Sequence, residues 1–211
     1  MSKLTSPRLR TTRLLQWIGK SYLKLFGWKV EGEVPLDRKF VAIVAHHTSN
    51  WDFPHLFAMS LYFKIPAYWL GKRTLFRVPL GWLMRCLGGI AIDRKSAHNV
   101  VDQAVQAFNE REEFVLGLTP EGTRGRTDYW KTGFYYIAQG AGVRIQLVFI
   151  DYKRKVCGLG PIVRPSGDLE GDMKKFREFY EHVEPKFPDK RGKIELDPDR
   201  KHPETTELPG A

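Results

Sequence analysis

Short runs of apolar residues recur along the chain and predict a buried β-sheet. Three runs have the length and the continuous apolar character of strands buried on both faces, and these are Phe40–Ala45, Phe114–Leu118 and Val143–Ile150. Two shorter runs, Ala67–Leu70 and Gly89–Ile92, are also predicted to be strands. Apolar residues at helical spacing predict helices over Phe53–Phe63, Ala97–Glu112, Gly133–Gln139 and Asp172–Val183. Because strands alternate with helices, we predict a single α/β domain with a central mixed sheet flanked by helices.

Residues 1–30 carry a helical pattern of a different kind. This segment holds no acidic residue and seven basic ones, which are Lys3, Arg8, Arg10, Arg13, Lys20, Lys24 and Lys29. Its apolar residues form a stripe at helical spacing, and we expect Trp17, Ile18, Tyr22 and Phe26 to face a membrane. A basic amphipathic helix is typical of a segment that lies flat in an anionic lipid interface. A terminal helix packed on the domain, with a solvated cationic face, would show the same pattern, so both interpretations stand.

Composition and charge narrow the classes of function. The chain has 211 residues, 42% of them hydrophobic, which suffices for one sizeable core, and its formal net charge is +10. This surplus suits anionic partners such as nucleic acid, phospholipid surfaces or phosphorylated substrates. The basic residues match no nucleic-acid reader motif, so we expect no nucleic-acid partner. The two cysteines form no CxxC pair, and no stretch approaches the ~20 apolar residues of a membrane span, so a cytoplasmic protein is expected. We expect three segments: the amphipathic helix (1–30), the main domain (31–197) and a polar, frayed tail (198–211).

The polar segment His46–Asp52 follows the first predicted strand and holds the strongest candidate chemistry. Pro54 suits a first helical turn, so we expect the next helix to start at about Asp52, with His47 in the loop before it. Asp52 could then accept a hydrogen bond from one imidazole nitrogen of His47 and raise the basicity of the other, which makes a general-base pair. Asp52 as a simple helix cap beside a surface histidine is the alternative.

Two other chemistries are weaker at this segment. A metal site would need His46, His47, Asp52 and His55 to converge, yet adjacent histidines in extended chain point apart, so no metal is expected. A serine hydrolase of the G-x-S-x-G type is disfavoured because that motif does not occur in the chain.

Two further polar clusters follow predicted strands. Thr119–Arg126 contains two glycines, which let backbone amides approach a ligand, and Thr123, Arg124 and Arg126 offer donors suited to phosphate. Asp93 and Arg94 form an acid–base pair at the end of another strand. Each cluster alone is also typical of an ordinary surface turn or ion pair. In α/β folds, ligands tend to bind where such strand ends meet.

Taken in order, the three clusters resemble the motifs of the glycerolipid acyltransferase superfamily, typified by 1-acylglycerol-3-phosphate acyltransferases. His47–Asp52 looks like its H-x-S-x-x-D motif, Gly89–Arg94 like G-x-x-x-x-D-R, and Pro120–Arg124 like P-E-G-T-R. The resemblance implies that His47 is the general base, that Asp52 orients it, and that the other two motifs bind the acceptor's phosphate. The phosphate-binding residues it implies are Arg94, Glu121, Gly122, Thr123 and Arg124.

The resemblance also implies the partners. It predicts transfer of an acyl group from acyl-CoA or acyl-carrier protein to a lysolipid hydroxyl, without a metal or organic prosthetic group, by a peripheral protein on the cytoplasmic face of an anionic membrane. His46 and Thr119 depart from the family's usual Asn and Phe, and residues 143–148 lack its proline motif, which indicates a divergent branch. A lipid hydrolase or transacylase that uses the same base, and a non-catalytic basic membrane protein, are the alternatives.

Overall fold

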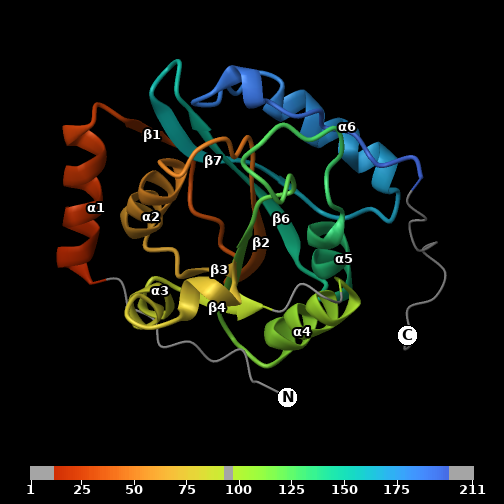
Figure 1. Ribbon diagram of the computed structural model, residues 1–211, viewed down its shortest axis with the longest axis horizontal. Helices are drawn as coiled ribbons and strands as arrows, with labels where there is room; N and C mark the ends of the chain where they lie inside the picture. Colours follow the sequence, from red (N-terminus) through yellow and green to blue (C-terminus); the bar gives the residue numbers. More distant parts are fainter. Residues whose placement is uncertain (1–11, 93–96, 200–211) are drawn as a thin grey trace.

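A seven-stranded sheet forms the centre of the computed structural model, which describes residues 12–92 and 97–199 (Figure 1). The strands are β1 (Lys29–Glu31), β2 (Lys39–Val44), β3 (Ala67–Lys72), β4 (Gly89–Ile92), β5 (Phe114–Leu118), β6 (Arg144–Asp151) and β7 (Val156–Val163). The α-helices are α1 (Arg13–Leu25), α2 (Asp52–Phe63), α3 (Gly81–Cys86), α4 (Ala97–Asn109), α5 (Gly133–Gly140) and α6 (Leu169–Tyr180). Two short 3₁₀ helices, η1 (Arg73–Phe76) and η2 (Pro188–Lys190), complete the described elements.

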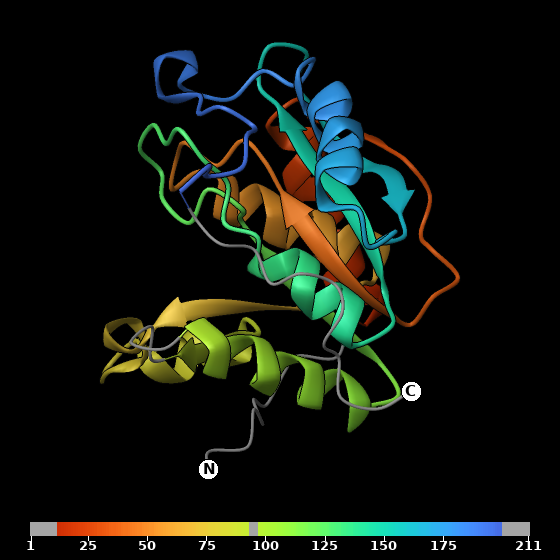
Figure 2. The ribbon, with the colours of Figure 1, turned by 90° about the vertical axis from the view of Figure 1, so that its right-hand side faces the viewer.

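The strands lie in the order β1-β7-β6-β2-β5-β3-β4. All neighbours from β6 to β4 pair in parallel, β1 pairs in parallel with β7, and only β6 and β7 are antiparallel among the described strands. The predicted fold class, a mixed sheet flanked by helices, is therefore confirmed. Because the carboxyl ends of parallel strands meet at one edge, the segments that follow β2, β5 and β3 gather there, at the left of Figure 2.

The predicted elements are present, with ends displaced by a few residues. β4 and β5 have the predicted bounds. α6 begins at Leu169 rather than at Asp172, because the Asp168 side chain accepts a hydrogen bond from the Gly171 amide at 3.0 Å and caps the helix there. η1 and α3 lie between β3 and β4, in a stretch rich in apolar and basic residues for which the sequence pattern predicted no element. Residues 200–211 of the predicted tail lie outside the described residues.

β1 and β7 are the strands that the sequence pattern did not predict. β7 contains Gly158, Gly160 and Pro161, which weaken any strand pattern. Both glycines are explained by close approach: a Cβ on Gly158 would lie 2.1 Å from the Glu31 carbonyl oxygen, and one on Gly160 would overlap the Phe179 ring. Gly158 and Gly160 thus weaken the strand pattern in the sequence, and the same two glycines allow β1 and the Phe179 ring to pack closely on β7.

The sheet divides the core into two layers, as the alternation of β2 shows. Val41 and Ile43 face one layer, which α4, α5 and α6 cover. Phe40, Ala42 and Val44 face the other, which α1 and α2 cover. Figure 1 shows α1 and α2 on the left of the sheet and α5 and α6 on the right. A strand buried on both faces needs the continuous apolar sequence that β2 has.

α1 packs on α2 and still exposes an apolar stripe. A Cβ on Gly19 would lie 2.6 Å from the Ala58 carbonyl oxygen, so the two helices touch backbone to backbone there, and Leu23 is buried beside this contact. The outward stripe consists of Leu14, Trp17, Ile18 and Leu25. α1 therefore packs on the domain through one side and exposes an apolar stripe on the other.

Candidate active site

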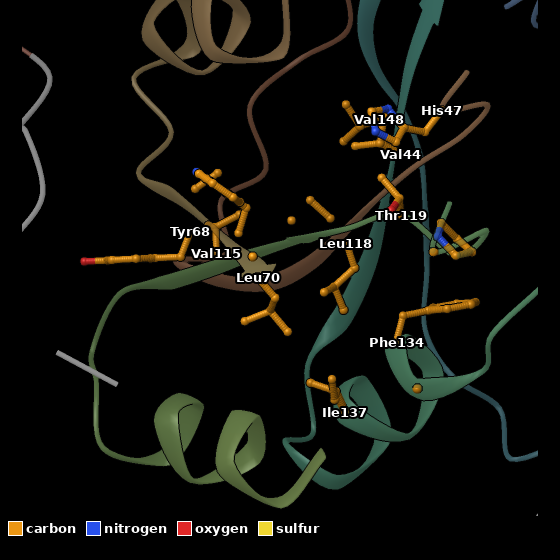
Figure 3. A pocket seen from close by; sticks show the side chains of 18 of the residues that line it. Val44, His47, Tyr68, Leu70, Val115, Leu118, Thr119, Phe134, Ile137 and Val148 are labelled. Atoms are coloured by element: carbon orange, nitrogen blue, oxygen red, sulfur yellow. The ribbon is translucent and has the colours of Figure 1, made fainter. Parts of the chain in front are cut away.

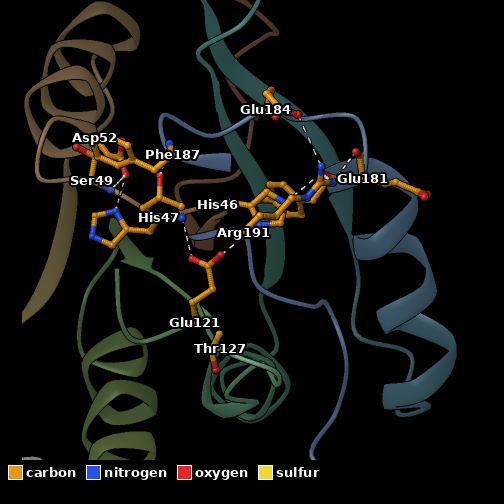
Figure 4. Close-up of polar contacts among 12 residues, drawn as sticks. His46, His47, Ser49, Asp52, Glu121, Thr127, Glu181, Glu184, Phe187 and Arg191 are labelled. Carbon is orange, nitrogen blue, oxygen red and sulfur yellow. Dashed lines mark hydrogen bonds and ion pairs between the residues drawn. The ribbon is translucent and has the colours of Figure 1, made fainter. Parts of the chain in front are cut away.

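The loop after β2 brings His47 and Asp52 together (Figure 4). α2 begins at Asp52, as Pro54 predicts, and the His47 Nδ1 atom lies 2.9 Å from Asp52 Oδ2. A carboxylate only accepts, so Nδ1 donates, and the other ring nitrogen, Nε2, carries the lone pair of a neutral imidazole. The Ser49 amide also donates to Asp52 Oδ2, at 3.1 Å. Asp52 is buried, whereas the His47 side chain remains 20% exposed and lines the pocket described below.

Tyr152 completes the hydrogen bonding of Asp52. Its hydroxyl donates to Asp52 Oδ1 at 2.7 Å from the turn that follows β6. Burial, and then the hydrogen bond to Asp52, raise the pKa of Tyr152 well above its usual range, so the phenol stays protonated and remains a donor. Sequence reasoning missed this residue because Tyr152 is 100 positions from Asp52 and belongs to no motif.

His55 lies one helical turn after Asp52 and faces aromatic rings. Its Nδ1 atom is 3.3 Å from the Tyr22 hydroxyl of α1, and its ring centroid is 4.6 Å from that of Trp28. Burial lowers the pKa of His55, against the smaller opposing effect of the Asp52 charge. A neutral His55 accepts a hydrogen bond from the Tyr22 hydroxyl, so this contact ties α1 to the helix that carries Asp52. The predicted membrane-facing position of Tyr22 is therefore wrong, because its hydroxyl points inward to His55.

Glu121 lies in the interior, behind the loop that joins β2 to α2 (residues 45–51). Its Oε2 atom accepts a hydrogen bond from the His47 backbone amide at 2.7 Å, and its Oε1 atom is 3.2 Å from His46 Nδ1. The second nitrogen of His46 donates to the Tyr180 carbonyl oxygen at 3.2 Å. Glu121 and His46 are both buried. The H-x-S-x-x-D segment and the P-E-G-T-R segment are therefore joined by hydrogen bonds, and these bonds fix the position of the His47 backbone.

The stretch after α6 also packs on the loop that joins β2 to α2. The Phe187 amide donates to Thr48 Oγ1 at 3.3 Å, and the Lys186 ammonium lies 5.1 Å from the centre of the Trp51 ring. Arg191 donates to the Tyr180 carbonyl oxygen at 3.2 Å, which fixes this stretch to the end of α6. The loop is thus braced from both sides.

A pocket of about 2000 Å³ opens beside His47 (Figure 3). At its polar end it is lined by His47, Thr119, Thr123, Arg124 and two cations that the sequence analysis did not single out, Lys131 and Lys190. Away from His47 the lining is mostly apolar and comes from both sheet and helices, including Tyr68, Leu70, Val101, Leu118 and Ile137. Pockets for drug-sized ligands measure about 300–1,000 Å³, so this one has room for a long apolar chain together with a polar group.

The comparisons with known proteins decide the family. A family model described as Acyltransferase matches residues 28–151, which is more than half of the chain. The matched part contains both the His47–Asp52 motif and the Pro120–Arg124 motif. The chain belongs to the acyltransferase family. This confirms the resemblance to the glycerolipid acyltransferase superfamily. The crystal structure of the 1-acyl-sn-glycerophosphate acyltransferase PlsC from Thermotoga maritima has the same fold, with a TM-score of 0.55 and 23% sequence identity over 79% of this chain and 75% of that chain. No curated protein sequence matches this chain.

Four of the seven site residues predicted for this acyltransferase line the pocket together, namely His47, Gly122, Thr123 and Arg124. Gly122 has a φ of 64°, a backbone conformation that favours glycine. Asp52 and Glu121 lie behind His47 and do not line the pocket. Arg94 lies outside the described residues. Within residues 12–92 and 97–199, no cluster of three or more His, Cys, Asp or Glu side chains is arranged to hold a metal ion.

Proposed function

We propose that this acyltransferase moves a fatty acyl group from an acyl thioester, acyl-CoA or acyl-carrier protein, to the hydroxyl of a lysophospholipid-like acceptor. The observation that carries the proposal is the His47–Asp52 hydrogen bond at the polar end of a large, mostly apolar pocket. A base at this position would meet the polar end of a lipid whose apolar chain fills the pocket, which supports acyl transfer to a lipid alcohol.

The reaction is one addition followed by one elimination. His47 Nε2 removes the hydroxyl proton as the oxygen attacks the thioester carbonyl, and Asp52 stabilises the imidazolium that forms. The tetrahedral oxyanion needs amide donors, and we assign these to the glycine-containing loop after β5, which lines the pocket together with His47. Collapse of the intermediate forms the ester, breaks the carbon–sulfur bond, and returns the proton from His47 to the departing thiolate. No metal and no prosthetic group takes part in these steps.

The acceptor's phosphate is assigned to the cationic end of the pocket. Arg124 and Thr123 are exposed there, and Lys131 and Lys190 add two more positive charges. Arg94 completes the set through the family resemblance alone. Glu121, although its motif is shared, is assigned to holding the His47 backbone, because its carboxylate is buried behind the loop.

The acceptor is proposed to come from an anionic membrane, on which the protein lies from the cytoplasmic side. The outward stripe of α1, Leu14, Trp17, Ile18 and Leu25, lies beside a row of cations, Arg13, Lys20 and Lys24. Apolar insertion and charge attraction therefore act on the same helix face. Among the described residues no helix is long and apolar enough to span a bilayer.

The experiment is acyl transfer by the purified protein from labelled acyl-CoA to a lysophosphatidate. His47→Ala should lower the turnover by about 10²–10⁴-fold, the usual contribution of a general base, and Asp52→Asn should cost less because the imidazole remains. Melting curves serve as the folding control. Near-wild-type turnover in His47→Ala would show that the proposed mechanism is wrong, and release of fatty acid without any acceptor would indicate a hydrolase instead.

A further inference from the structure

The segment between β3 and β4, residues 72–87, presents large apolar side chains to solvent. The side chains of Leu75, Val78, Leu80, Trp82 and Leu83 are all exposed, with Val78 at 96% and Trp82 at 71%. Isolated surface apolar residues are ordinary, but here five exposed ones fall within nine consecutive positions, a group that we call the patch, and large apolar patches mark interaction sites. We call residues 72–87 the β3–β4 segment.

This exposure is built into the fold, because the β3–β4 segment is anchored at both ends. Phe76 is buried, and its ring centroid lies 5.9 Å from that of Trp69. The Trp69 indole donates to the Leu87 carbonyl oxygen at 3.0 Å. A Cβ on Gly81 would lie 2.0 Å from the Phe76 carbonyl oxygen, so the chain doubles back tightly between η1 and α3. Only one side of the segment is used for packing, and the other is held outward.

The charged residues within the β3–β4 segment all have one sign. No acidic residue occurs between positions 53 and 92, whereas five basic residues do, namely Lys64, Lys72, Arg73, Arg77 and Arg85. Four of these belong to the β3–β4 segment. An apolar patch with a cationic border is complementary to an anionic lipid leaflet, since each cation near the surface contributes about 1 kcal/mol of attraction.

The β3–β4 segment also lies at the edge of the sheet that carries the active site. It follows β3, which pairs in parallel with β5, and β5 pairs in parallel with β2, so the segment and the His47 loop leave the sheet at the same edge (Figure 2). Thr74, Leu75, Met84 and Leu87 line the pocket that His47 also lines. A surface that contacts lipid here would bring the leaflet to the pocket itself.

We propose that the β3–β4 segment is a membrane-contact surface separate from α1, and that it inserts Val78, Leu80 and Trp82 into an anionic leaflet. The proposal rests on the proposed function only in taking the acceptor from a membrane. Its physical basis, the patch and its charge, is independent of the chemistry at His47.

The test measures how the full-length protein distributes between buffer and vesicles of equal parts phosphatidylglycerol and phosphatidylcholine. Val78→Asp with Leu80→Asp should lower the partition coefficient about tenfold or more, because two apolar side chains can no longer be buried. The matched control is Val34→Asp with Leu36→Asp, two exposed apolar residues in the loop before β2, which should leave binding unchanged. Combining the first pair with Trp17→Ser and Leu25→Ser in α1 should multiply the two losses, because the surfaces are separate.

Tryptophan fluorescence gives a second measurement. Lipids brominated in their acyl chains should quench the emission of a Trp17→Phe protein, and Trp82→Phe in that background should remove most of this quenching. If Val78→Asp with Leu80→Asp melts at a lower temperature, Val78→Asp alone supplies the partition test, since that side chain makes almost no contact with the protein.

Unchanged vesicle binding in these variants would overturn the proposal. So would a loss confined to reactions with acyl-carrier protein as donor, because the patch would then bind the acidic carrier and not the leaflet. Lower vesicle binding in a protein that transfers no acyl group would support this surface while refuting the proposed function, so the two failures are distinguishable.

Discussion

Replacing Tyr152 by phenylalanine tests whether the active site depends on the hydrogen bond that sequence reasoning missed. The Tyr152 hydroxyl donates to Asp52 Oδ1 at 2.7 Å, and Asp52 is 1% exposed, so water cannot readily take its place. Phenylalanine keeps the ring that packs against Trp28, at 5.1 Å between centroids, and removes only the donor. The change therefore isolates one contact.

The magnitude follows from the nature of that contact. A hydrogen bond to a charged group is worth about 1.5–3 kcal/mol. Because each 1.36 kcal/mol of barrier is about a tenfold change in rate, kcat should fall by about ten- to a hundredfold if the whole bond serves the transition state. KM for either substrate should change little, since Tyr152 is not among the residues that line the pocket. Stability should also fall, so rates are to be measured well below the melting temperature of the variant.

The assay is steady-state acyl transfer. A double-mutant cycle with Asp52 tests whether Tyr152 affects kcat through its hydrogen bond to Asp52. If Tyr152 acts through Asp52, then Tyr152→Phe should cost much less in an Asp52→Ala background than in the wild type. Tyr62→Phe is the control, because it removes a hydroxyl from α2 that forms no hydrogen bond among the described residues. Equal losses in both backgrounds, or a loss in KM alone, would refute the positioning role.

Three further predictions test the surroundings of the site. Arg124→Ala should raise KM for a phosphorylated acceptor about ten- to a hundredfold, the worth of a charged hydrogen bond, while KM for the thioester stays constant; equal increases would assign Arg124 to the donor or to structure. Glu121→Ala should lower the free energy of unfolding by about 2–6 kcal/mol in a denaturant titration, because the His47 amide and the buried His46 ring lose their hydrogen-bond partner at about 1–3 kcal/mol each, and a drop below about 1 kcal/mol would contradict this. The pKa of His55 is lowered on folding, so the unfolded chain binds a proton at this residue more readily than the folded chain does. The contribution of His55 to stability should therefore be fully present above about pH 6.5 and should decrease as the pH falls below that value. The melting temperature of His55→Asn should depend less on pH in this range.

The parts of the fold that could be predicted from sequence are those whose signal is local. β2, β5 and β6 are buried on both faces, so their apolar runs are continuous and readable. The start of α2 follows from Pro54, whose ring fits only a first turn. The His47–Asp52 pair is predictable for the same reason, because the residues are five apart on one loop and one helix start.

The contacts that escaped prediction join residues distant in the chain. Tyr152 reaches Asp52 only because β6 pairs with β2 in parallel and ends at the same edge. β7 was not predicted because glycine in a sequence usually indicates the end of a strand. In the structure Gly158 lies inside the strand, where it allows close approach of the β1 backbone. Motif reasoning also assigned Glu121 to substrate, since an acidic residue between a proline and a glycine gives no indication of which way its side chain turns.

The position of Glu121 changes how the two motifs relate to each other. The His47 amide and the His46 ring both contact its carboxylate, so the loop after β5 fixes the backbone of the loop after β2. The residues that follow it, Thr123 and Arg124, are then directed to the pocket beside His47. A single stretch thus holds the His47 backbone from behind through Glu121 and presents the Arg124 cation to the pocket that His47 lines. Under the proposed function, a shift of this stretch would therefore move the proposed base, His47, and the proposed phosphate-binding group, Arg124, together.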